Sequence, residues 1–169
     1  ILKQRPVKQS DITKCQGWDR LNATIWPMIE ETLKAYPTGG VITRLQLAKL
    51  PSGKSINPHF DTGFILRSSH RIHIPLITHE KVEFWIEGQK TFFEAGKAVE
   101  INNRLEHSVY NQSTLDRVHL IFDYLPPQHN QYSFLSQKSP FIYKTSLNPN
   151  SLPTVLVSTI NHAAKKGEN

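Results

Sequence analysis

The stretch from Val41 to Tyr124 consists of short alternating or β-branched runs, and this pattern limits the possible folds more than any other feature. Turn-forming residues separate the runs, for example at residues 51–53, 87–88 and 95–96. Short runs of this composition, bounded by turn residues, are typical of β-strands. The pattern therefore predicts an all-β region of about eight strands.

A single amphipathic helix is expected ahead of these strands. Apolar residues recur at three- and four-residue steps between Asp19 and Ala35, and Pro37 ends the pattern. We expect Pro27 to lie near the first turn of this helix, where proline is tolerated. After residue 125 the chain is rich in Ser, Asn, Gln and Pro. We therefore expect one domain at residues 1–125 with its core at 41–124, and a loosely structured C-terminal extension at residues 126–169 docked on the barrel.

Composition excludes some classes of protein and favours others. The chain of 169 residues can bury a core without disulfides, and its single cysteine, Cys15, cannot form an internal one. No apolar run matches a membrane span or a signal peptide, which favours a reducing cytoplasm and no membrane partner. The net charge of +6 could attract an acidic partner, but the basic residues are scattered, which argues against nucleic acid.

Three predicted strands each direct two polar side chains to one face. In a strand, residues i and i+2 share a face and lie about 6.6 Å apart. Arg71 and His73 form one such pair inside an apolar run, and Arg117 and His119 repeat the arrangement. The tripeptide His59-Phe60-Asp61 carries a third pair. Unpaired buried charge is expensive, so the face that these groups share is predicted to line a ligand cavity.

A further imidazole, that of His107, follows the turn-like Asn102-Asn103-Arg104. Alone, a histidine on a strand is more often a hydrogen-bonded core residue than a ligand, and a His-x-Asp triplet is common by chance. The order of His59, Asp61 and His107 within one β-rich region favours a metal site. Two imidazoles and one carboxylate form the facial triad of non-haem Fe(II) oxygenases, although zinc can take the same ligands.

The inward arginines favour iron with an anionic cosubstrate over zinc alone. A guanidinium forms a two-pronged, charge-assisted pair with a carboxylate. Arg117 can hold the distal carboxylate of 2-oxoglutarate, while Arg71 and His73 meet the carboxylate next to the metal. His119 shares the face of Arg117 and is expected to be a pocket residue, not a metal ligand.

Several segments of the chain occur in an order that resembles a known family, the aspartyl/asparaginyl β-hydroxylase-like 2-oxoglutarate oxygenases, which also include free-proline cis-4-hydroxylases. These segments are Leu50–Gly53, Pro58–Asp61, His70–Leu76, Glu100–Asn103, His107–Asn111 and Arg117–Asp123. The resemblance implies a mainly β fold: a double-stranded β-helix of the jelly-roll, cupin-like type with an N-terminal helix packed on it.

The resemblance also implies a site and an activity. Fe(II) would be bound by His59, Asp61 and His107, and 2-oxoglutarate would be held by Arg117 with help from Arg71 and His73. The expected reaction consumes dioxygen (O2), releases succinate and CO2, and hydroxylates an amino acid or an Asp/Asn-type residue in a peptide or protein. Asp61 makes the chain similar to the small microbial members, because the animal peptidyl-aspartate members lack that acidic ligand.

Two other functions remain open at this point. One is a cupin-like metal-dependent enzyme that does not use 2-oxoglutarate, and the other is a non-catalytic ligand-binding barrel. Turnover independent of 2-oxoglutarate would favour the first, whereas intact ligands at all three metal positions count against the second. Residues 62–70 are expected to form either a substrate-facing loop or a plain surface connection.

Overall fold

The computed structural model describes residue 8 and residues 13–15, 17–127 and 141–152 of the chain. Within these residues a long helix precedes eight strands, and a ninth strand follows. The elements are α1 (Trp18–Leu33), β1 (Val41–Leu50), β2 (Ser55–His59), α2 (Phe64–Ser68), β3 (His70–Ile77), β4 (Val82–Ile86), β5 (Gln89–Thr91), β6 (Lys97–Ile101), β7 (His107–Asn111), β8 (Arg117–Leu125), β9 (Phe141–Ser146) and η3 (Pro149–Ser151).

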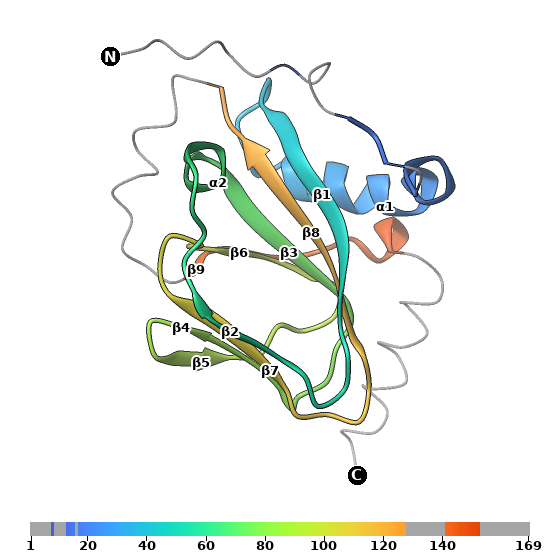
Figure 1. The fold of residues 1–169 in the computed structure, drawn as a ribbon. Coiled ribbons are helices and arrows are strands. Elements are labelled where there is room, and N and C mark those ends of the chain that lie inside the picture. Colours follow the sequence, from blue (N-terminus) through green and yellow to red (C-terminus); the bar gives the residue numbers. More distant parts are fainter. Residues whose placement is uncertain (1–7, 9–12, 16, 128–140, 153–169) are drawn as a thin grey trace.

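The strands form two antiparallel sheets. The larger sheet has the order β1-β8-β3-β6-β9, and the smaller has the order β2-β7-β4-β5 (Figure 1). The chain crosses from one sheet to the other after β1, β2, β3, β5, β6 and β7. Such repeated crossing is the topology of a jelly roll. The fold is therefore a double-stranded β-helix with the N-terminal helix packed on it, as predicted.

Strand alternation divides the interior into two clusters of buried side chains. Helix α1 lies on the outer side of the larger sheet (Figure 1). Even-numbered residues of β3 and β8 pack against it. A second cluster joins the facing sides of the two sheets. The first cluster includes Ile25, Met28, Ile29, Ile72, Ile74, Leu120 and Phe122, and the second includes Leu50, Val82, Phe84, Ile86, Val99, Ile101 and Val109. The predicted division of faces on β3 and β8 is confirmed.

Helix α1 agrees with its predicted range but not with the predicted place of its proline. Pro27 lies inside the helix and not in the first turn, so that part of the prediction is wrong. An interior proline removes one backbone hydrogen bond and tends to kink a helix. Burial of Ile25, Met28 and Ile29 on either side of Pro27 stabilises the helix against this cost.

The C-terminal extension supplies an edge strand where the sequence indicated loose structure. Strand β9 pairs antiparallel with β6, with Ala98 opposite Thr145. Leu147, just beyond β9, is buried in the cluster beneath α1. Most of the predicted extension, residues 128–140 and 153–169, lies outside the described residues.

The segment at residues 62–70 is not a plain loop, because it contains the short helix α2 and the first residue of β3. Phe64 and Ile65 of α2 are exposed. Among the helices that the structure describes, none is long and apolar enough to cross a membrane.

Candidate metal centre and a buried arginine group

The pairing of β2 with β7 brings the predicted metal ligands together. His59 ends β2, His107 begins β7, and the two residues are opposite each other in the ladder. Their ring centroids lie 4.3 Å apart. Asp61 follows two residues after His59, and its backbone N–H donates to the carbonyl of Asn103 at 3.1 Å. One candidate ligand atom from each of the three residues lies within 4.8 Å of the others.

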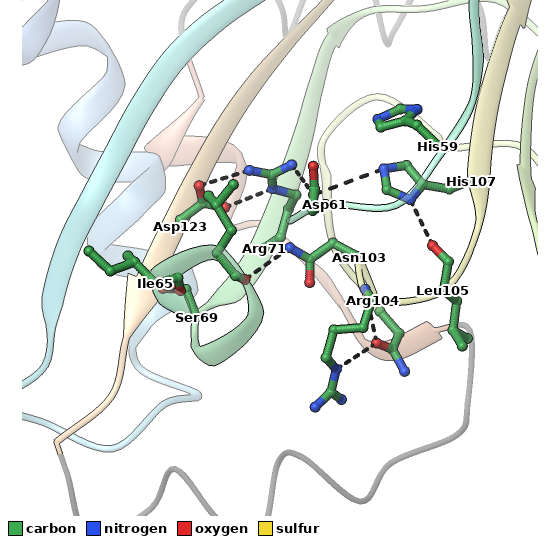
Figure 2. A network of polar contacts seen from close by, with 12 residues as sticks. His59, Asp61, Ile65, Ser69, Arg71, Asn103, Arg104, Leu105, His107 and Asp123 are labelled. Atoms are coloured by element: carbon green, nitrogen blue, oxygen red, sulfur yellow. Dashed lines mark hydrogen bonds and ion pairs between the residues drawn. The ribbon is translucent and has the colours of Figure 1, made fainter. Parts of the chain in front are cut away.

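Hydrogen bonds to the backbone determine which imidazole nitrogens are free. Nδ1 of His59 lies 2.8 Å from the carbonyl oxygen of Asn57. Nδ1 of His107 lies 2.9 Å from the carbonyl oxygen of Leu105 (Figure 2). A carbonyl only accepts, so each Nδ1 carries a hydrogen, and Nε2 is the nitrogen through which either neutral imidazole would bind a metal. Burial, together with the nearby His59, lowers the pKa of His107. Two imidazoles and one carboxylate are therefore a donor set that fits a divalent cation.

The third predicted ligand, Asp61, is held by Arg71. Nη1 of Arg71 donates to Oδ2 of Asp61, while Nε and Nη2 donate to the two carboxylate oxygens of Asp123 at 2.8 and 2.9 Å (Figure 2). Burial alone would lower the pKa of Arg71, but the hydrogen bonds and charges of Asp123 and Asp61 raise it above its ordinary value. Arg71 thus has two anionic partners within the protein.

Asp123 is a site residue that the sequence reasoning did not single out. It is fully buried on β8 and shares the inward parity of Arg117 and His119. An acidic residue at an inward position of an apolar strand was the available signal, because a buried carboxylate requires a partner.

A second polar group, formed by His73, Arg117 and His119, lies on the same inward face. Arg117 is only 2% exposed, and its Nη2 donates to Nδ1 of His119 at 2.7 Å. Nδ1 of His73 lies 3.3 Å from the same nitrogen. Burial lowers the pKa of Arg117 to about 10, which still leaves it charged at neutral pH. In the part of the chain that the structure describes, no carboxylate forms an ion pair with Arg117.

The polar atoms of this second group are incompletely satisfied. Nε of Arg117 and Nε2 of both His73 and His119 are buried without a hydrogen-bond partner. Burial and the charge of Arg117 lower the pKa values of both histidines well below the ordinary value, so both imidazoles are neutral. The group therefore carries one uncompensated positive charge. Such a group needs an anion, because unsatisfied buried cations are costly.

A family model described as aspartyl/asparaginyl β-hydroxylase matches residues 13–127 of the chain. The chain belongs to this family. Both polar groups of the aspartyl/asparaginyl β-hydroxylase domain lie inside the matched range. No curated protein matches the chain significantly. Among solved structures, the protein YhaK from Escherichia coli is similar with a TM-score of 0.47 and 16% identity, over 66% of this chain and 45% of YhaK. The chain thus spans less than half the length of YhaK.

The site residues expected from the sequence therefore fall into two groups. His59, Asp61 and His107 come together as one candidate metal centre. Arg117, His73 and His119 form the second buried polar group. Arg71, which was expected to help hold the cosubstrate, contacts Asp61 and Asp123.

Proposed function

We propose that the protein is an Fe(II)- and 2-oxoglutarate-dependent dioxygenase. Its substrate is an amino acid or an Asp/Asn-type residue in a peptide or protein, which it hydroxylates. The observation that carries the proposal is Arg117, a buried guanidinium without an acidic partner among the described residues. It lies on the inward face of a fold that also brings three candidate metal ligands together.

In this proposal His59, Asp61 and His107 hold Fe(II). Two neutral imidazoles and a carboxylate satisfy three positions of the ion and leave others open. When bound, Fe(II) with 2-oxoglutarate supplies the oxidative chemistry, in which O2 is consumed, succinate and CO2 are released and a substrate C–H bond is hydroxylated. The backbone carbonyls of Asn57 and Leu105 orient the two imidazoles before the ion arrives.

The distal carboxylate of 2-oxoglutarate pairs with Arg117. The guanidinium is held by His119 and lies away from water, where a charge-assisted pair is stronger than at the surface. His73 and His119 are neutral and leave the positive charge of Arg117 for the ligand.

The test is titration of the protein with 2-oxoglutarate in the presence of Mn(II), without oxygen. Arg117→Lys keeps the charge but loses the planar fork, so the affinity should fall. Arg117→Met removes a charge-assisted pair of about 2–5 kcal/mol, so the affinity should fall roughly 30-fold to several thousand-fold. Mn(II) affinity should survive both changes.

A matched control is Arg44→Met, because Arg44 lies on the neighbouring strand β1 but is exposed. It should bind 2-oxoglutarate like the wild type. Undiminished affinity in Arg117→Met would place the distal carboxylate elsewhere. A wild type that binds Mn(II) but not 2-oxoglutarate would refute the proposal and favour a cupin-like enzyme without this cosubstrate.

A further inference from the structure

We propose that Arg71 and Asp123 are positioning residues for the metal ligand Asp61, and that Arg71 is not a ligand of the cosubstrate. The inference rests on the proposed function in one respect, namely that His59, Asp61 and His107 hold a divalent cation. It assigns a role to a buried acid, Asp123, and changes the role expected for Arg71.

The first step concerns how firmly Asp123 holds Arg71. The two residues are directly opposite each other in the antiparallel pairing of β3 with β8. Cross-strand neighbours on one face have adjacent side chains, so the ladder itself brings them together. Two parallel N–H···O bonds of 2.8 and 2.9 Å then match the fork of the guanidinium to both oxygens of the carboxylate. Asp123 is 0% exposed, so water does not compete for this pair.

The second step concerns what this fixed guanidinium does to Asp61. Asp61 lies beyond the end of β2, in a segment without regular structure, so no strand ladder orients its side chain. The third donor of Arg71, Nη1, bonds to Oδ2 of Asp61. The same Oδ2 lies 4.0 Å from Nε2 of His107. Arg71 therefore restrains the carboxylate of Asp61 beside the imidazole with which it would share the cation.

The third step concerns charge. A lone arginine beside Asp61 would cancel the negative charge that attracts a cation. Asp123 compensates for that arginine, so the set of Asp61, Arg71 and Asp123 keeps a net charge of one negative unit. The metal centre thereby gains an oriented carboxylate without losing its attraction for a cation.

The two inward arginines also differ in what they can offer a ligand. Arg71 has carboxylate partners on all three of its donor nitrogens. Arg117 has an imidazole partner, and its Nε has none. An anionic cosubstrate is therefore attracted to Arg117, whereas Arg71 belongs to the metal centre.

The experiment measures Mn(II) affinity of the metal-free full chain by electron paramagnetic resonance, without 2-oxoglutarate and well below the unfolding temperature. Asp123→Asn removes the negative charge that compensates for Arg71 and weakens the hydrogen bonds that orient its guanidinium. Each of these two effects should lower the Mn(II) affinity. Arg71→Lys keeps the charge but loses the fork, so it lowers affinity through orientation alone. We expect a loss of about 10- to 100-fold in each variant, the usual result of changing a residue that orients a metal ligand.

The matched control is Glu100→Gln. Glu100 is another buried acid, 1% exposed on β6, but it bonds Tyr36 and His70 at 2.7 and 2.8 Å. Its variant should lose thermal stability yet keep Mn(II) affinity. This control separates loss of a buried ionic network in general from loss of the contact to Asp61.

The second measurement is 2-oxoglutarate affinity at saturating Mn(II), which should stay near the wild-type value in both variants. Wild-type Mn(II) affinity in folded Asp123→Asn or Arg71→Lys would overturn the inference. So would Arg71→Lys protein that binds Mn(II) normally but 2-oxoglutarate weakly, because Arg71 would then be a cosubstrate ligand. If Asp123→Asn fails to fold, Arg71→Lys decides. Absence of 2-oxoglutarate binding by the wild type would refute the proposed function, yet the Mn(II) measurement would still test this inference.

Discussion

Arg71 and Arg117 show how the same side chain acquires different roles from its surroundings. Both point inward from strands of the larger sheet, and they are 8% and 2% exposed. Carboxylates raise the pKa of Arg71 against the effect of burial, whereas burial alone acts on Arg117 and lowers its pKa to about 10. A guanidinium with its own acids orients a neighbour, and one without them binds an anion from outside.

The metal ligands give the first prediction at this scale. His107→Ala and Asp61→Ala should each abolish turnover and weaken Mn(II) binding, because each removes one of three donor atoms. The measurement is Mn(II) titration followed by electron paramagnetic resonance, with His79→Ala as a histidine control outside the group. Normal Mn(II) affinity in His107→Ala would show that the ligand assignment is wrong.

The buried histidines give a prediction about pH. Burial and Arg117 lower the pKa values of His73 and His119 well below their ordinary 6.5. Below that pH the unfolded chain binds protons at these imidazoles and the folded chain does not, so the free energy of unfolding should fall as pH falls. Each such histidine contributes a slope of at most about 1.4 kcal/mol per pH unit.

Denaturant unfolding of metal-free protein between pH 7 and pH 5 measures this slope. In His119→Gln, the free energy of unfolding should depend less steeply on pH. The slope should fall by the contribution of one imidazole, because glutamine does not bind a proton in this range. Parallel curves for the wild type and the variant would contradict a neutral His119 in the folded protein.

At the scale of elements, β8 serves two functions with its two faces. Leu120, Phe122 and Tyr124 pack in the cluster beneath α1, while Arg117 and Asp123 line the site. Strand β3 is divided in the same way, with Ile72 and Ile74 packed in the cluster beneath α1, so the helix supports the site from behind through two shared strands. Substitutions on the face toward α1 should therefore change stability, whereas substitutions on the inward face should change ligand binding.

This separation can be tested on α1. Ile29→Ala should lower the free energy of unfolding by about 2–5 kcal/mol, because Ile29 is fully buried and its loss leaves a cavity. Mn(II) affinity should not change, since the cluster lies on the other side of the sheet from the metal centre. Denaturant unfolding measures the first quantity, with the exposed Arg20→Ala as control. A large effect of Ile29→Ala on Mn(II) affinity of the folded protein would contradict the separation.

At the scale of the whole molecule, the described C-terminal strand completes the larger sheet. Strand β9 covers the edge of β6, which would otherwise present unpaired backbone groups. The family match ends at residue 127, before this strand. We propose that residues 1–125 carry the chemistry and that residues 126–169 stabilise the barrel.

Truncation after Pro127 tests this division. The shortened chain should unfold at a lower temperature and aggregate more readily, because β6 becomes an exposed edge. Its Mn(II) and 2-oxoglutarate affinities should persist at low temperature, because every candidate ligand precedes residue 127. Calorimetry and ligand titration measure the two effects. Loss of both affinities in a folded truncated chain would show that the extension contributes to the site.

The sequence by itself determined which side chains share a face. The two-residue period of a strand is a local property of the backbone, so the inward direction of Arg71, His73, Arg117 and His119 could be predicted without a structure. Helix α1 was predicted from its own period for the same reason. The order of His59, Asp61 and His107 in a β-rich region was sufficient to propose a metal centre, which the paired strands then bring together.

Only the tertiary structure decided which partner each inward group has. The contact of Arg71 with Asp123 depends on the register of β3 against β8, and the strand at residues 141–146 forms where the edge of β6 is available. Pro27 is accommodated because packing on the sheet outweighs a local preference. Registers and edges depend on segments far apart in the chain, so local periodicity does not contain them. For that reason the sequence predicted two inward arginines, and the fold distinguished the one that orients Asp61 from the one left for an anion.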